Sequence, residues 1–158
     1  MRVHQLAKEL DLKITKDISK TFNHKFRTTK NILEAGYDVQ KINLKKLNAV
    51  FKKHKIPMAA DFKKISEIKD IDKFILSNLK KGNDLAILFL WKAFGHKVKW
   101  GHYVLISSYN PKDKTVEVCD TSPKNKSFWT AKISKFISGM QDKWDGKERG
   151  IFIFKKLK

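Results

Sequence analysis

The stretch Trp100-Gly101-His102-Tyr103-Val104-Leu105-Ile106 decides how the rest of the chain is interpreted. Its residues alternate with the period of a β-strand, and a second run of this kind, Val116-Glu117-Val118-Cys119-Asp120, follows it. The segment Asn110-Pro111-Lys112-Asp113 between the two runs is typical of a turn. The sequence therefore predicts an antiparallel β-hairpin over these residues.

The predicted hairpin brings a histidine and an aspartate together. His102 begins the first strand and Asp120 ends the second, and in an antiparallel pair these ends lie side by side. An imidazole within hydrogen-bond reach of a carboxylate makes up two parts of a catalytic triad, because the acid fixes the tautomer of the base. We therefore predict His102 as a candidate base and Asp120 as its orienting acid. The neighbouring residues Trp100, Gly101 and Tyr103 are candidate binding residues.

Chain length and cysteine content restrict the class of protein. The 158 residues fit one domain, residues 1–158, with a sizeable core. A single cysteine cannot form an intrachain disulfide, so a cytoplasmic protein is expected. No apolar run reaches the roughly 18 residues of a membrane span, and the N-terminus has no signal-peptide core. The sequence therefore predicts a soluble protein without a membrane span, and it leaves the oligomeric state open.

The formal charge of +19 comes from 35 lysines and arginines against 16 acidic residues. Such a field concentrates polyanions, nucleic acid among them. Arginine, which recognises bases and phosphates with two parallel hydrogen bonds, occurs only at Arg2, Arg27 and Arg149. A lysine-rich solvated surface and nonspecific polyanion binding both stay open, and sequence-specific recognition is disfavoured. Aromatic residues interleaved with lysines would suit single-stranded nucleic acid, although we expect most of them in the core; examples are Trp91-Lys92, Lys99-Trp100 and Phe128-Trp129.

Helical spacing dominates the first half of the chain. Apolar residues at intervals of three and four predict helices, and polar residues, Pro57 and Gly82 supply their start and stop signals. The predicted helices cover residues 3–26, 28–36, 44–51 and 70–79, with a short strand over 37–42.

Strand patterns dominate the second half. Leu85–Trp91 is apolar on both faces, which is typical of a central strand. After the hairpin we expect a polar loop over 121–127, a helix over 133–140 capped near Thr130, and a last strand over 150–154. This order predicts an α+β fold, in which N-terminal helices pack on an antiparallel sheet formed by the C-terminal half.

Four features in this order resemble the papain-like domain of the bacteriocin-processing (double-glycine leader) cysteine peptidases. They are the helix end and strand over Leu79–Trp91, the strand Gly101–Leu105, the strand ending at Asp120, and Phe128-Trp129 with the following helix and Trp144-Asp145-Gly146. The resemblance runs from about Leu6 to the C-terminus. It implies a papain-like fold with His102 as catalytic base and Asp120 as orienting acid. Where the family usually has Asp-Pro, this chain has Asp120-Thr121-Ser122-Pro123.

The resemblance also implies a nucleophilic cysteine on an N-terminal helix and an oxyanion-hole glutamine just ahead of it. Neither is present; Leu6–Leu10 resembles the segment after that helix, so Met1 begins just beyond the expected cysteine. The only thiol is Cys119, whose side chain should point away from that of Asp120, and we expect it to be buried and structural. A hydroxyl could replace the thiol, although a capping or surface role is favoured for each candidate. These candidates are Ser19, Thr21, Thr28 and Thr29.

Metal and cofactor chemistry find little support. His96 and His102 lie six positions apart with no further ligand at a suitable spacing, and the seven glycines form no phosphate-binding loop. No metal and no cofactor are predicted.

Three functions of different classes follow. The favoured one is a papain-like, peptidase-type domain that binds a peptide or protein partner without hydrolysing it. The second is an active peptidase or hydrolase, completed by a hydroxyl nucleophile or by a missing N-terminal segment. The third is a basic nucleic-acid or ribosome-associated binding module. In the simplest alternative His102 is an ordinary hydrogen-bonded histidine at a strand end.

Overall fold

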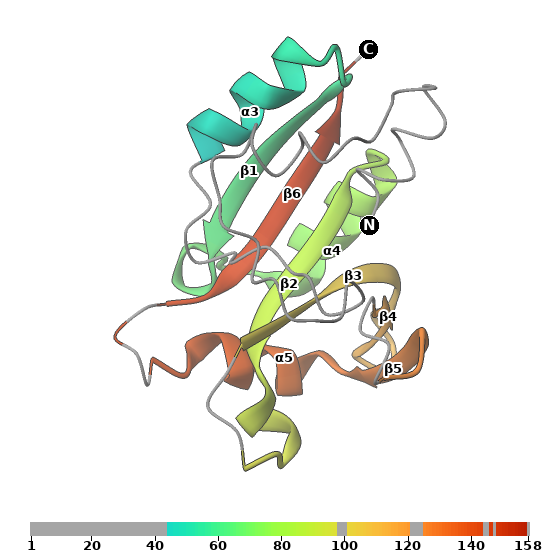
Figure 1. Ribbon diagram of the computed structural model, residues 1–158. Helices are drawn as coiled ribbons and strands as arrows, with labels where there is room; N and C mark the ends of the chain where they lie inside the picture. Colours follow the sequence, from blue (N-terminus) through green and yellow to red (C-terminus); the bar gives the residue numbers. More distant parts are fainter. Residues whose placement is uncertain (1–43, 98–100, 121–124, 144–145, 147, 158) are drawn as a thin grey trace. The chain divides into compact units, whose positions relative to one another are not determined.

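The computed structural model describes residues 44–97, 101–120, 125–143, 146 and 148–157 (Figure 1). The helices predicted over 3–26 and 28–36 and the strand predicted over 37–42 lie outside these residues. The chain divides into two compact units. One consists of Met1–Ala59 with Leu157–Lys158, and the other of Ala60–Lys156.

The described part of the first unit contains one predicted helix. Helix α3 (Leu44–Lys53) matches the prediction over 44–51 and runs slightly further. Two lysines lie in its last turn, where their positive charge is attracted to the negative end of the helix dipole. Pro57 follows the turn after α3, and its carbonyl accepts a hydrogen bond from the Leu157 backbone at 2.9 Å.

The second unit is built on a six-stranded sheet with the order β1-β6-β2-β3-β4-β5 (Figure 1). The strands are β1 (Met58–Lys64), β2 (Asp84–Leu90), β3 (Gly101–Asn110), β4 (Thr115–Cys119), β5 (Phe128–Lys132) and β6 (Gly150–Lys156). Strand β2 pairs antiparallel with β3 and β6, and β4 pairs antiparallel with β3 and β5. The predicted hairpin, the predicted central strand and the α+β class are therefore confirmed.

Two helices cover one face of this sheet. Helix α4 (Ile71–Lys80) and helix α5 (Ile133–Gln141) both contact β2. Every second residue of β2 joins a buried cluster with apolar residues of β3, β4 and both helices. The cluster includes Ile75, Leu85, Ile87, Phe89, Val104, Ile106, Val116, Val118, Phe136 and Met140. Burial of this face is the main source of stability for the unit.

The ends of α4 follow the sequence signals. The Asp70 carboxylate accepts a hydrogen bond from the Lys73 backbone at 2.9 Å, which caps the helix. Gly82 adopts a left-handed φ of 74° after the helix, a conformation that costs glycine little. The helix predicted over 70–79 is confirmed.

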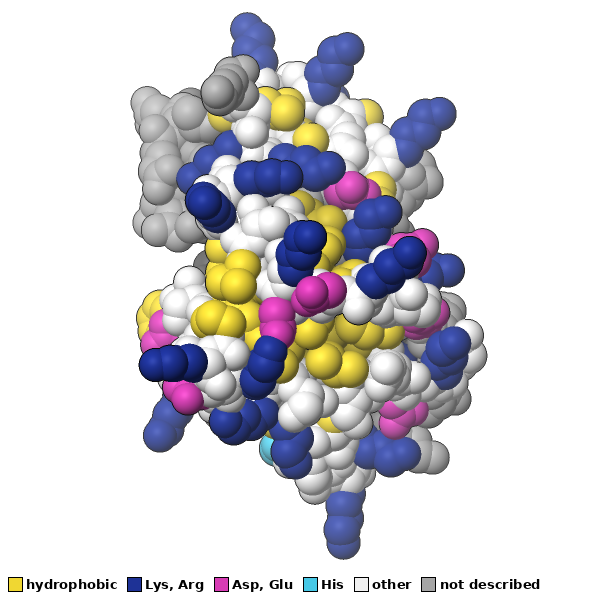
Figure 2. Space-filling view, turned by 180° about the vertical axis from the view of Figure 1, so that it is seen from behind, with side chains coloured by type: hydrophobic (Ala, Val, Ile, Leu, Met, Phe, Trp, Pro, Cys, Tyr) yellow, Lys and Arg dark blue, Asp and Glu magenta, His cyan; other side chains and the backbone are white. Residues whose placement is uncertain are grey.

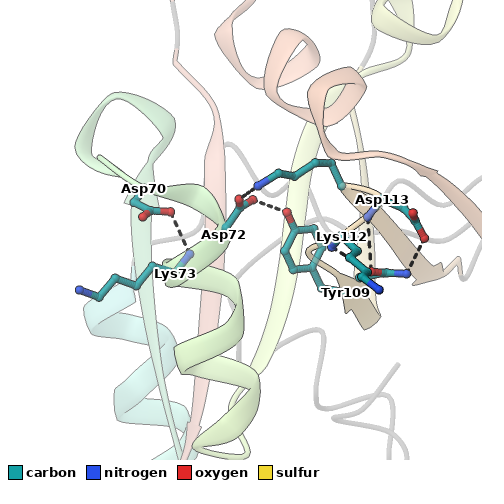
Figure 3. A network of polar contacts seen from close by, with 8 residues as sticks. Asp70, Asp72, Lys73, Tyr109, Lys112 and Asp113 are labelled. Carbon is teal, nitrogen blue, oxygen red and sulfur yellow. Dashed lines mark hydrogen bonds and ion pairs between the residues drawn. The ribbon is translucent and has the colours of Figure 1, made fainter.

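A polar network ties α4 to the turn of the hairpin (Figure 3). The Asp72 carboxylate accepts hydrogen bonds from the Tyr109 hydroxyl and the Lys114 ammonium. In the turn itself, Asn110 accepts from the Lys112 backbone at 3.0 Å and donates to the Asp113 carboxylate at 2.6 Å. These bonds fix the end of the hairpin that lies away from His102 and Asp120.

Two strands were not predicted, and the sheet does not come from the C-terminal half alone. Strand β1 lies in the first half, and its sequence Met-Ala-Ala-Asp-Phe-Lys-Lys lacks the β-branched residues that identify strands. Strand β5 occupies Phe128–Lys132, and the helix predicted to be capped near Thr130 has its N-cap two residues later, at Lys132, without a side-chain hydrogen bond. The Ile133 N–H at the start of α5 instead donates to the Lys114 carbonyl at 2.8 Å, because the β4–β5 ladder continues to that point.

Candidate functional site

His102 and Asp120 meet as the hairpin predicts. His102 Nε2 lies 2.9 Å from Asp120 Oδ1. The β3–β4 register pairs Leu105 with Cys119, which places Val104 opposite Asp120 and His102 at the diagonal position on the same face. The predicted contact is therefore confirmed, while the catalytic role of the pair stays a prediction.

The Asp120 carboxylate is held from three sides. Its side chain has no exposed surface. While Oδ1 faces His102, Oδ2 accepts hydrogen bonds from Asn125 Nδ2 at 2.8 Å and from Trp129 Nε1 at 3.2 Å. The Asp120 N–H donates to the Ser127 carbonyl at 2.8 Å. An ionised carboxylate is an acceptor only, so these donors match it, and the proton of the imidazole belongs on Nε2. His102 Nδ1 then carries the lone pair that could accept a proton.

Aromatic rings enclose the imidazole. The indole of Trp91 stacks on it with centroids 5.1 Å apart and an interplanar angle of 21°. Phe89 meets its edge at 5.9 Å, and Trp129 stacks on Trp91 at 5.9 Å. The His102 side chain keeps 19% of its surface exposed. Its orientation is therefore fixed by packing as well as by Asp120, and part of the ring still reaches solvent.

Strand pairing explains how these rings converge. Phe89 is the partner of His102 in the β2–β3 ladder, and Trp91 begins the 3₁₀ helix that follows β2. That short helix ends at Gly95 with a left-handed φ of 85°. Trp129 is the partner of Val118, two residues before Asp120 and on the same face of the sheet.

The predicted binding residues lie in different places. Trp100 lies outside the described residues. Gly101 begins β3, pairs with Leu90 and is exposed. Tyr103 pairs with Leu88, and its ring stacks beside the His102 imidazole with centroids 6.4 Å apart and an interplanar angle of 30°. Burial raises the pKa of its phenol. The structure thus brings His102 and Asp120 together and places the Tyr103 ring beside the imidazole, while the binding roles stay predictions.

Cys119 lies on the face opposite to that of Asp120, as expected from strand alternation. It is partly exposed, however, so the prediction of a buried thiol is wrong. Its partner across the ladder is Phe128, which keeps 57% of its surface exposed, because no helix covers that part of the sheet in the described chain. The candidate hydroxyl nucleophiles Ser19, Thr21, Thr28 and Thr29 lie outside the described residues.

Three residues of the site were not among the predicted site residues. Trp91, Asn125 and Trp129 surround the His102–Asp120 pair. Trp91 could have been assigned to the site from the sequence, because strand alternation places it on the same face as Phe89. A half-buried indole needs an acceptor for its N–H. For Trp129 this need indicates a nearby acceptor such as Asp120.

Other chemistry is not favoured by the described residues. His96 is exposed and lies against Trp91 at 4.8 Å between ring centroids. Among the residues that the structure describes, no group of three histidine, cysteine or acidic side chains could hold a metal ion. In the same part of the chain, no helix has the length and apolar character needed to cross a membrane.

No family model matches this chain, and no curated protein matches it either. The papain-like assignment therefore depends on the sequence resemblance and on the geometry of the site.

Proposed function

We propose that this chain is a papain-like, peptidase-type domain that binds a peptide or protein partner next to His102 and does not hydrolyse it. The observation that carries the proposal is the 2.9 Å contact between His102 and Asp120, with the carboxylate buried and held by Asn125 and Trp129. Such a pair fixes an imidazole in one tautomer, as a catalytic base requires.

The position of sulfur argues against hydrolysis by the described residues. A cysteine nucleophile must reach the imidazole to lose its proton. The only cysteine of the sequence is Cys119, on the opposite face of the sheet from His102 and Asp120. Where no cysteine lies beside the imidazole, His102 Nδ1 can accept a hydrogen bond from a peptide N–H, and the half-buried indoles of Trp91 and Trp129 offer apolar contact.

A hydrolase with a hydroxyl nucleophile is the second candidate. The intact pair favours it, because Nδ1 could take the proton of a serine or threonine as its oxygen attacks a peptide carbonyl. The pair then returns that proton to the leaving amine. The candidate hydroxyls for this function, Ser19, Thr21, Thr28 and Thr29, lie outside the described residues.

Binding and cleavage can be measured on the same sample. A panel of unstructured peptides is added to the ¹⁵N-labelled chain, and the indole N–H signals of Trp91 and Trp129 and the backbone signal of His102 are followed by NMR. We expect some peptides to shift these signals and to be recovered uncleaved, with or without an alkylating agent.

The matched variants are His102→Ala and His54→Ala, since His54 is an exposed histidine outside the site. His102→Ala should weaken binding, and His54→Ala should not. Cleavage that is lost in His102→Ala but survives alkylation would favour the hydrolase. A panel that leaves the signals around His102 unchanged would contradict the proposed function.

A further inference from the structure

Strand β5 forms one edge of the sheet, and its outer side has no partner among the described residues (Figure 1). The Asp120 N–H bonds to the Ser127 carbonyl, and the Ile133 N–H bonds to the Lys114 carbonyl. Antiparallel strands alternate between residues that bond inward and residues that bond outward. The N–H groups of Phe128, Thr130 and Lys132 and the C=O groups of Phe128 and Thr130 therefore point away from β4. Lys132 is the N-cap of α5, so its C=O accepts the first hydrogen bond of that helix.

The same three residues present their side chains on the uncovered face. Phe128, Thr130 and Lys132 are all exposed, whereas Trp129 and Ala131 pack against the core. An edge with free backbone groups is a template for another strand, and proteins that avoid such pairing place charges there. The charged residue of β5 is Lys132, and Lys126 lies two residues before the strand, so the edge selects for an acidic strand as much as it repels a basic one.

We infer that β5 binds an extended acidic peptide segment by strand addition. The incoming strand would exchange backbone hydrogen bonds with Phe128 and Thr130 and accept one from the Lys132 N–H. It would place an apolar side chain beside Phe128 and acidic side chains near the lysines. Lys126 and Lys132 are exposed at the two ends of β5. One ammonium hydrogen of Lys132 is used by the Asp113 carbonyl at 2.5 Å, which leaves two donors for a carboxylate.

A second copy of the chain fits this edge less well. Antiparallel pairing of two β5 strands about Thr130 would set Lys132 of each copy beside Phe128 of the other. It would also bring two chains of formal charge +19 together at their lysine-bearing edges. An acidic peptide removes this repulsion. The inference goes beyond the proposed function, because strand addition at β5 needs neither His102 nor Asp120.

The test uses a synthetic peptide, acetyl-Glu-Ser-Thr-Ser-Val-Ser-Glu-amide, and two isomers methylated on alternate backbone nitrogens in the two possible phases. The two isomers have equal mass and charge. Only one of them has its methyl groups on the backbone nitrogens that would donate hydrogen bonds to β5. We expect one isomer to bind like the parent peptide and the other to bind at least about tenfold more weakly. Equal binding of both isomers would overturn the inference.

Amide hydrogen exchange locates the added strand. The parent peptide should slow exchange at Phe128, Thr130 and Lys132, and it should leave Trp129 and Ala131 unchanged because β4 already protects them. Binding that slows none of the three outward amides would overturn the inference.

Two variants separate strand addition from general charge attraction. Thr130→Pro removes an outward N–H without removing a bond to β4 and should weaken the parent peptide at least about tenfold. Lys132→Glu should weaken it, while Lys80→Glu, at an exposed position on α4 with the same change of net charge, should not. Equal weakening by the two lysine variants would contradict the inference. So would a dimer without peptide that Thr130→Pro converts to monomer, because the edge would then be occupied by a second copy.

Discussion

At the scale of single residues, Asp120 is the group on which the site depends. It is fully buried, and its two oxygens accept from His102, Asn125 and Trp129. Removing the carboxylate leaves buried donors without an acceptor, which costs more than the hydrogen bonds themselves contribute. The same residue therefore supports both the fold and the tautomer of His102.

Asp120→Ala should lower the free energy of unfolding by about 3 kcal/mol, measured by urea denaturation. Asp113→Ala, which removes an exposed carboxylate from the hairpin turn, is the control and should cost about 1 kcal/mol or less. Equal losses for the two variants would mean that the buried network contributes little to stability.

Tyr103 gives a prediction about alkaline pH. Burial raises its pKa above the ordinary tyrosine value of 10.0, so the folded state holds the phenol proton more tightly than the unfolded state does. The protonated phenol makes its full contribution to the free energy of unfolding below pH 10.0. This contribution is lost as the pH rises from that value through the pKa of the folded state, because the phenol of the unfolded state ionises first.

Tyr103→Phe should therefore lose less stability than the unaltered chain between roughly pH 9 and pH 11. The measurement is the free energy of unfolding across this range, with phenolate absorbance of the folded chain as a second readout. Parallel stability curves for the two chains would contradict a half-buried Tyr103 with a raised pKa.

The sequence predicts part of the site at this scale. His102 and Asp120 could be found because a short hairpin is a local structure, and strand alternation places both on one face. Trp91 and Asn125 could not be assigned in the same way. Contact of Trp91 with His102 depends on the pairing of β2 with β3 and on the turn at Gly95, and Asn125 lies in a loop without a periodic pattern.

At the scale of elements, the packing of α5 on β2 depends on Gly139. A methyl group at this position would lie 2.9 Å from the Leu90 carbonyl oxygen and 3.1 Å from the Phe89 Cβ. Those contacts are closer than side chains tolerate, so the helix would have to move away from the strand.

Gly139→Ala should lower the free energy of unfolding by about 2 kcal/mol, although alanine favours helices over glycine by up to about 1 kcal/mol. Ser138→Ala, on the exposed side of the same helix, should change it by no more than about 0.5 kcal/mol. A stabilised Gly139→Ala chain in thermal or urea unfolding would contradict the close packing of α5 on β2.

Elements with strong periodicity could be predicted, and edge strands could not. Strand β2 and helix α4 carry continuous apolar patterns with clear stop signals. Strands β1 and β5 lie at the two edges of the sheet and are only partly buried, so their sequences show a weak pattern. Their existence follows from the pairing of the whole sheet and not from local propensity.

At the scale of the whole molecule, charge is the dominant feature. Figure 2 shows lysine and arginine side chains over much of the visible face, with acidic and hydrophobic side chains between them. Charge spread in this way attracts polyanions without reading a base sequence. Trp91 and Trp129 do not form a stacking platform with it, because both pack against the core.

Any binding to RNA should therefore be nonspecific. Affinity for a single-stranded RNA, measured by fluorescence anisotropy, should fall at least about a hundredfold between roughly 50 and 200 mM salt. Two RNAs of equal length and different sequence should bind alike. Sequence preference that survives the higher salt would contradict this account of the charge.

The central claim is that Asp120 holds His102 in the tautomer of a base. Long-range ¹H–¹⁵N NMR of the His102 ring at about pH 8, where an ordinary histidine is neutral, tests it most directly. The account predicts a protonated Nε2 in a hydrogen bond and an unprotonated Nδ1, with this state lost in a folded Asp120→Asn variant. A proton on Nδ1, or a ring whose signals do not respond to Asp120→Asn, would contradict it.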